Sequence, residues 1–193
     1  KLAQEIIYAA REGSGGLPIS VKTRLGYNKD ILEEWLPILL ETKLSAITIH
    51  ARTRKEMSKV PAHWDRVKDA VALARGSGTL IIGNGDVKDV SDAREKIKQT
   101  GADGIMLGKS IFGNPWLFNG RTIAPTVEER LRVMVEHTKL FEDKFTGYKN
   151  FAIMKKHYKA YAEGFAGAKE LRMKLMEAKD SAEVESIVKN FLS

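Results

Sequence analysis

The chain has 193 residues, carries a formal net charge of +7 and contains no cysteine. Hydrophobic residues make up 43% of it, which is enough for a buried core and excludes a disordered chain. No apolar run approaches the roughly 18 residues of a membrane span, so we expect a cytoplasmic protein without membrane contact. The lack of cysteine excludes a disulfide scaffold, a thiolate metal site and a cysteine nucleophile or acid from this chain, and we expect no metal site.

The first part of the chain alternates between helix-like and strand-like segments. Apolar periodicity and turn residues predict helices over residues 1–12, 30–42, 65–75 and 89–100. Short apolar runs predict strands over Ile19–Lys22, Ala46–His50, Thr79–Ile82 and Gly104–Leu107. We expect Asp30 to cap the second helix, Asp89 or Ser91 to cap the fourth, and Gly101 to end it. Alternating strands and helices indicate parallel βα units.

The pattern changes after Asn114-Pro115-Trp116. Beyond this segment we find no strand signal, and apolar residues recur at helical spacing in four segments. Their apolar faces contain Leu131, Met134 and Val135; Met154, His157, Tyr158 and Tyr161; Leu171, Leu175 and Met176; and Val184, Ile187 and Val188. We expect Ser181 to cap the last helix. The segments indicate a helical bundle, with a domain boundary at Arg121–Pro125 that separates residues 1–121 from residues 122–193.

Each strand-like run ends in residues of a kind that can hold a phosphorylated cofactor. They are Lys22, His50, Asn84, Gly85, Asp86, Gly108 and Lys109. In a parallel barrel the chemistry lies at the carboxyl ends of the strands. Glycines let backbone N–H groups approach a phosphate, and a lysine adds charge. Ordinary turns, a rim lysine and a structural histidine explain the same residues singly, but we expect Lys22 and His50 to be neighbours across the sheet.

Basic residues are concentrated in two further places. Arg52 and Arg54 follow the second strand, on the side of the cofactor-type residues. The second group is Lys155, Lys156, Lys159, Lys169, Arg172 and Lys174, with Tyr158 and Tyr161 among them. One interpretation is a solvated helix face around core tyrosines, and the other is contact with the phosphates of RNA. The net charge of +7 is compatible with both.

Taken together, these segments resemble the tRNA-dihydrouridine synthase family. The matching runs are Val21–Gly26, Ile49–Arg54, Gly83–Val87, Asp103–Lys109, Gly113–Trp116 and Met154–His157, with Tyr161, Gly164, Gly167–Ala168 and Leu171–Arg172. They follow the order and spacing of the family along nearly the whole chain. The family pattern has Gly and Arg where this chain has Ala51 and Lys109. Because lysine lacks the bidentate fork of arginine, we expect weaker or differently shaped phosphate binding.

The resemblance implies an oxidoreductase with FMN as cofactor and NADPH as reductant, which reduces the 5,6 double bond of uridines in tRNA. Lys22 and His50 would then contact the flavin. The residues that would bind its phosphate and ribityl chain are Asn84, Gly85, Asp86, Gly108 and Lys109. Those that would contact tRNA are Arg52, Arg54, Lys155, Lys156, Lys159 and Arg172.

The resemblance also implies that part of the enzyme is absent from this chain. The chain corresponds to the C-terminal half of a (β/α)8 TIM-type barrel, with four βα units, followed by an all-α helical bundle domain. The family's first four strands carry part of the flavin site and a cysteine that acts as general acid. We therefore predict no catalytic residue on this chain and a missing N-terminal barrel half as its partner. The alternatives are a non-catalytic RNA-binding remnant of that fold and another FMN-dependent barrel oxidoreductase, similar to dihydroorotate dehydrogenase.

Overall fold

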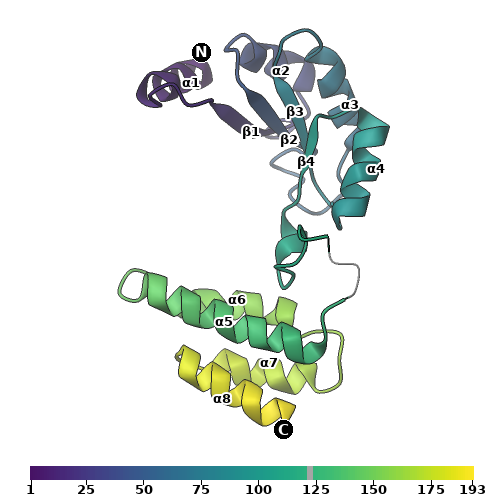
Figure 1. The fold of residues 1–193 in the computed structure, drawn as a ribbon. Helices are drawn as coiled ribbons and strands as arrows, with labels where there is room; N and C mark the ends of the chain where they lie inside the picture. The colour runs from purple at the N-terminus through teal and green to yellow at the C-terminus, as the bar shows by residue number, and fades with distance from the viewer. Residues whose placement is uncertain (121–123) are drawn as a thin grey trace. The chain divides into compact units, whose positions relative to one another are not determined.

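The computed structural model describes residues 1–120 and 124–193, which form two compact units (Figure 1). Unit 1 is Lys1–Lys109 and unit 2 is Ser110–Ser193. The chain thus divides earlier than the boundary predicted at Arg121–Pro125, part of which lies outside the described residues.

Unit 1 alternates helices and strands. Its helices are α1 (Leu2–Gly13), α2 (Leu32–Leu40), α3 (Trp64–Leu73) and α4 (Val90–Thr100). Its strands are β1 (Ser20–Arg24), β2 (Ala46–His50), β3 (Leu80–Asn84) and β4 (Gly104–Met106). All neighbouring strands pair in parallel, in the order β1-β2-β3-β4. The predicted parallel βα units are therefore confirmed, and the arrangement is consistent with part of a TIM barrel.

Two strands run further than the sequence predicted. Strand β1 continues to Arg24 and β3 continues to Asn84, because both residues pair in register with His50 on β2. The longer strands carry two more polar side chains to the carboxyl edge of the sheet. This extension decides which residues form the site described below.

The two ends of α4 follow the expected capping chemistry. The Asp89 side chain accepts a hydrogen bond from the backbone N–H of Asp92 at 2.8 Å, and it is the residue that caps α4. Gly101 ends this helix with a left-handed φ of 74°. The prediction that Asp30 caps α2 is wrong, because Ile31 takes the N-cap position and no side chain caps this end. Asp30 lies one residue earlier and accepts from the N–H of Leu32 at 2.9 Å.

The two faces of the sheet have different surroundings. Ile47, Ile49 and Ile81 are fully buried in a core with apolar residues of α2 and α3. Helices α2, α3 and α4 lie side by side along the sheet (Figure 1). Since successive strand residues point to opposite faces, Thr48 and His50 belong to the other face. That face carries the polar strand ends.

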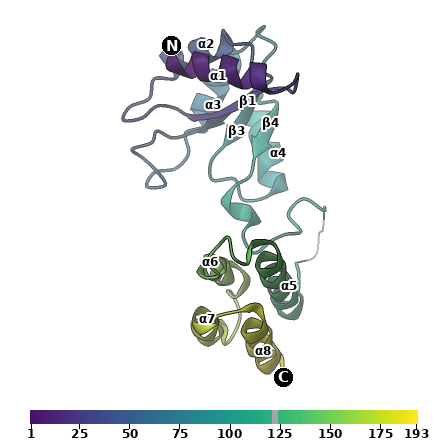
Figure 2. The ribbon, with the colours of Figure 1, turned by 90° about the vertical axis from the view of Figure 1, so that its left-hand side faces the viewer.

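Unit 2 is built from helices around a second core. The helices are α5 (Val127–Phe145), α6 (Ala152–Tyr161), α7 (Ala168–Glu177) and α8 (Ser181–Leu192). Figure 2, which views them nearly end-on, shows the four arranged around a common centre. The fully buried members of this core include Leu131, Met134, Met154, Tyr158, Leu171, Leu175 and Val184.

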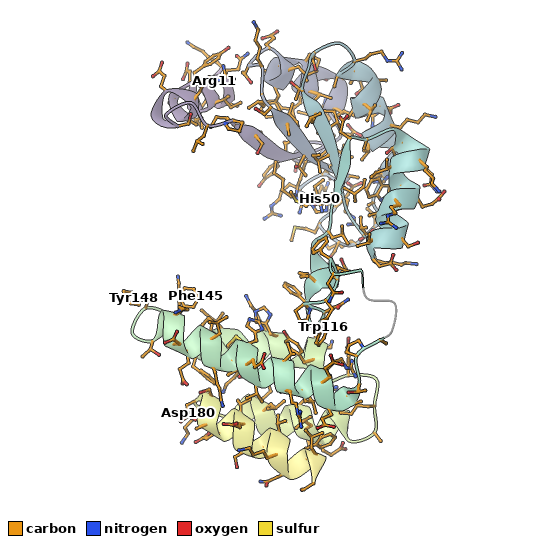
Figure 3. All side chains as sticks on the ribbon, in the orientation of Figure 1. Arg11, His50, Trp116, Phe145, Tyr148 and Asp180 are labelled. Carbon is orange, nitrogen blue, oxygen red and sulfur yellow. The ribbon has the colours of Figure 1, made fainter. Side chains whose placement is uncertain are left out.

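Two details of the predicted bundle are wrong. Met176 is 53% exposed and does not belong to the core, because it lies one position beyond the buried Leu175. Asp180, labelled in Figure 3, caps α8 in place of Ser181 by accepting from the N–H of Glu183 at 2.8 Å. A carboxylate at this position also interacts favourably with the positive end of the helix.

The segment that opens unit 2 packs on α6. It begins with a 3-10 turn, η1 (Lys109–Ile111), and the ring of Phe112 then meets that of His157 edge-on, with 5.4 Å between centroids. A Cβ on Gly113 would lie 2.3 Å from the carbonyl oxygen of Ala160, so this backbone approach requires glycine. Across residues 1–120 and 124–193, no helix combines the length and apolar character that crossing a membrane requires.

Candidate functional site

A cavity of about 260 Å³ opens at the carboxyl edge of the sheet. The strand register brings Arg24, His50 and Asn84 into one row across β1, β2 and β3, and His50 is labelled in Figure 3. The residues lining the cavity are Arg24, His50, Arg52, Met57, Ser58, Asn84, Gly85, Asp86, Val87, Gly108 and Lys109. Six of the seven residues predicted to bind a cofactor therefore surround one cavity.

Lys22 is the exception among the predicted residues. Its partner on β2 is Thr48, and the neighbour of His50 on β1 is Arg24, so the expected pairing of Lys22 with His50 is wrong. Lys22 lines a second hollow of about 610 Å³, beside the unpaired edge of β1, together with Tyr27 and Arg54. Arg24 lines both hollows.

The glycine turn after β3 is held from behind by Trp64. The flat ring of Trp64 occupies the space that a side chain on Gly83 would need. Its indole N–H donates to the carbonyl of Gly85 at 3.1 Å. Asn84 is fixed by its amide, which donates to the carbonyl of Met106 at 2.8 Å and ties the turn to β4. The turn facing the cavity is therefore pre-organised, as an anion site requires.

Arg52 has a structural role that the sequence did not reveal. It is only 5% exposed, its Nε donates to the carbonyl of Val60 at 2.6 Å, and its guanidinium forms an ion pair with Asp86. Arg52 is therefore buried and paired, unlike an ordinary surface cation, and its contact with tRNA stays a prediction. Asp86 also accepts from the N–H of Ala62 at 2.9 Å, so this carboxylate ties the loop after β2 to the turn after β3.

Among the residues that the structure describes, Asp86 is the only acidic one lining the cavity, and Arg52 forms an ion pair with it. Partial burial acts to raise the pKa of Asp86, but the hydrogen bonds from Arg52 and Ala62 outweigh it and the pKa is lowered. Within the described part of the chain, Arg24 and Lys109 form no ion pair, although Arg24 donates to the carbonyl of Thr53 at 3.0 Å. The cavity thus has an uncompensated positive charge, which suits an anionic ligand.

His50 responds to this excess of positive charge. Burial, followed by repulsion from Arg24, Lys22 and Arg52, lowers its pKa to about 4. The imidazole is therefore neutral at pH 7, where it can accept and donate a hydrogen bond without adding charge.

This electrostatic arrangement gives a testable pH dependence. Because the folded pKa of His50 lies below its unfolded value near 6.5, the unfolded state binds more protons between pH 6.5 and about 4. Stability should therefore be intact above pH 6.5 and decline as the pH falls towards 4, and His50→Gln should flatten that decline.

An NMR-monitored pH titration of the His50 imidazole measures its pKa directly. We expect a value well below 6 in dilute buffer and a clear rise when inorganic phosphate is added. His63, which is outside the cavity, provides the internal control. A His50 pKa near the ordinary value of about 6.5, or one that does not change when phosphate is added, would contradict an anion site here.

The predicted RNA-contacting cations divide into two groups. Lys155 donates to the carbonyl of Met176 at 2.6 Å, and Arg172 donates to the carbonyl of Ala162 at 2.6 Å, so both satisfy backbone groups at helix ends. Arg54, Lys156 and Lys159 are exposed, as the RNA hypothesis requires. Their contact with tRNA stays a prediction.

Sequence reasoning missed four residues of the cavity. They are Arg24, Met57, Ser58 and Val87. Arg24 could have been found, because it follows Lys22 by two positions. A predicted strand two residues longer would have placed both side chains on the same face. The other three lie in loops whose path carries no periodic signal.

Comparison with known proteins decides the family. The dihydrouridine synthase (Dus) family matches residues 1–193. The chain belongs to this family. It is 40% identical to the probable tRNA-dihydrouridine synthase of Staphylococcus epidermidis strain RP62A and 37% identical to the probable tRNA-dihydrouridine synthase 2 of Bacillus subtilis strain 168. Each match covers 98% of this chain but 59% of the relative, so this Dus chain spans about three fifths of their length.

Proposed function

We propose that this Dus chain is the flavin-phosphate and RNA-binding part of an FMN-dependent tRNA-dihydrouridine synthase. The observation that carries the proposal is the cavity at the strand ends, where Arg24 and Lys109 face a pre-organised glycine turn without an ion-pair partner. A phosphate monoester matches this site in charge and in its need for several N–H donors. The family membership supports tRNA as the substrate, and with it a cytoplasmic location.

The residues at the strand ends divide into two roles in this proposal. Lys109, Gly85 and Gly108 would hold the FMN phosphate, and a Cβ at Gly108 would meet no atom within 4 Å, which leaves room for a ligand. His50 would face the ribityl chain or ring as a neutral imidazole. When bound, FMN supplies the hydride for the 5,6 double bond of uridine, with NADPH as the source of the electrons.

Lys22 would contact the flavin ring, and its side chain lies on the same face of β1 as that of Arg24. Nearby protein and the charge of Arg24 lower the pKa of its ammonium, although the side chain remains exposed. A cation at this position is a donor to an electron-rich ring or to developing negative charge. Lys22 borders the open edge of the sheet, so its flavin contact would be completed from outside this chain.

A complementary barrel half is the partner that the sheet requires. Within residues 1–120 and 124–193, strands β1 and β4 each pair on one side only, which leaves two edges of free backbone donors and acceptors. Leu80 and Met106 are 50% and 37% exposed on the strands themselves. Four further βα units would cover both edges and this surface. The general acid implied by the resemblance would also come from that half, since this chain has no cysteine.

The proposal predicts that the intact protein binds FMN through Lys109. Replacing Lys109 with Glu removes a cation and adds repulsion, and we expect FMN to bind at least about tenfold more weakly, which is about 1.4 kcal/mol. Lys68→Glu is the matched control, because Lys68 is an exposed lysine of α3 outside the cavity. Quenching of flavin fluorescence measures binding, and dihydrouridine content of tRNA measures the reaction with NADPH.

The outcomes separate the three functions considered. FMN binding together with NADPH-dependent formation of dihydrouridine supports the proposal. An intact protein that binds tRNA but no flavin would instead be an RNA-binding remnant. A flavoprotein that leaves tRNA unchanged and oxidises or reduces a small substrate would instead be an FMN-dependent barrel oxidoreductase similar to dihydroorotate dehydrogenase.

A further inference from the structure

Unit 2 contains a hollow of about 550 Å³ that the cofactor site does not use. It lies between α5, α6 and the segment that follows η1. This volume is within the range of about 300–1,000 Å³ that is usual for sites of small ligands. All its lining residues belong to unit 2, so the hollow is defined without reference to unit 1.

Aromatic and apolar side chains form the walls of this hollow. Phe112 meets the ring of His157 edge-on, and His157 in turn lies 5.3 Å from the ring of His137. Phe112 and Leu140 are 55% and 57% exposed, which is unusual for large apolar side chains lining the same depression. The wall is rigid on one side, because the close approach of Gly113 to α6 fixes the segment that carries Phe112.

Polar atoms remain free inside these walls. Nδ1 of His137 lies 3.2 Å from the hydroxyl of Tyr161, which leaves Nε2 of His137 without a partner in the described chain. His157 has no hydrogen bond to any described residue through either nitrogen. Burial lowers the pKa of both rings, so each is neutral at pH 7 and offers one N–H and one lone pair. Glu136 adds a carboxylate to the lining.

We propose that this hollow binds one unstacked nucleobase of the RNA substrate. A nucleobase has a flat apolar face that can stack on Phe112, and its edge carries in-plane donors and acceptors for the free imidazole nitrogens. An apolar helix or a leucine-rich peptide would fill the walls equally well but would leave three imidazole nitrogens unpaired. The inference rests on the proposed action on tRNA.

The surroundings of the hollow carry the charge that a nucleotide needs. Lys156 precedes His157 on α6, is exposed, and is close enough to lower the pKa of His157. It forms no ion pair with the described residues. A phosphate next to the bound base would be neutralised by Lys156, and one lysine contact of this kind contributes to the salt dependence of RNA binding.

The direct test uses the intact protein and mononucleotides followed through the imidazole resonances. AMP, GMP, CMP and UMP should shift the signals of His137 and His157, and at least one of them should do so at millimolar concentration. Ribose 5-phosphate, which lacks a base, should leave both unchanged. An equal response to ribose 5-phosphate would mean a phosphate site, and no response to any nucleotide would refute the inference.

Two variants connect the hollow to tRNA. His157→Phe keeps an aromatic ring but removes both nitrogens, and Leu140→Trp fills the rim; each should weaken tRNA binding about tenfold and leave FMN binding unchanged. Met173→Trp, on the exposed surface of α7 outside the hollow, is the matched control. Unchanged tRNA affinity in both variants would overturn the role in tRNA binding. If the wild-type protein ignores tRNA while nucleotides still shift both histidines, the proposed function fails and the base site stands.

Discussion

Replacing Arg52 with Met should both destabilise unit 1 and weaken FMN binding. Methionine keeps the apolar stem of the side chain but removes every donor. The carbonyl of Val60 then loses its partner, and Asp86 loses the cation that neutralises it. Breaking a buried pair from one side costs about 3–5 kcal/mol. Because the Asp86 side chain is half exposed, water compensates in part, and we expect about 2–3 kcal/mol.

The effect on binding should exceed what the loss of stability explains. The Arg52 contacts anchor the loop that brings Met57 and Ser58 to the cavity, and Asp86 belongs to the phosphate turn. At a temperature where the variant is still folded, we expect its dissociation constant for FMN to be at least about tenfold higher. Urea unfolding and flavin titration measure the two effects separately.

Arg54→Met is the matched control for Arg52→Met. The two arginines lie two positions apart in one loop, but Arg54 is exposed, and the one hydrogen bond of its guanidinium to a described residue goes to the sulfur of Met57. We expect its stability to change by less than about 0.5 kcal/mol. If the two variants unfold alike, the buried ion pair does not hold this loop.

The contrast between these arginines shows what the sequence could and could not predict. Periodicity placed the four strands and the helices, because alternation and capping are local properties that Asp89 and Gly101 report directly. The face on which a loop residue lies depends on the path of the chain. Arg52 and Arg54 therefore looked equivalent in the sequence, although one is buried and the other is exposed.

Register had a similar effect on the site. The prediction grouped Lys22 with His50 because both ended apolar runs. The hydrogen-bonded pairing places Arg24 beside His50, a shift of two residues that keeps the same face but moves the cation along the strand. Apolar content alone does not indicate where a strand ends when its last residues are polar and face a cavity.

Gly83→Ala is expected to be the most damaging single-methyl substitution in the sheet. The new Cβ would lie 2.5 Å from Cζ3 and 3.0 Å from Cη2 of Trp64. The ring cannot retreat freely, since its N–H is bonded to Gly85 and the ammonium of Lys96 lies 4.5 Å above it. Overpacking of this kind costs about 1–3 kcal/mol, and we expect the upper end of that range.

The same substitution should also impair the cofactor site. Gly83 precedes the phosphate turn directly, so relief of the clash must move either Trp64 or the strand that carries Asn84 and Gly85. We expect weaker FMN binding in addition to the lower stability. Gly13→Ala is the matched control, because a Cβ at Gly13 meets no atom within 4 Å and its backbone is not left-handed.

A double-mutant cycle shows whether Trp64 is the cause. Trp64→Leu destabilises by itself, because it removes the ring and the bond to Gly85, but it also removes the atoms that Gly83→Ala would strike. In the Trp64→Leu background, Gly83→Ala should therefore cost less than about 1 kcal/mol, and the two changes should be strongly non-additive. A cost that is the same in both backgrounds would mean that the glycine is required by the strand and not by the ring. Trp64 holds the turn through its hydrogen bond to Gly85 but does not line the cavity. Strong coupling would therefore show that a side chain behind the cavity positions the cofactor site.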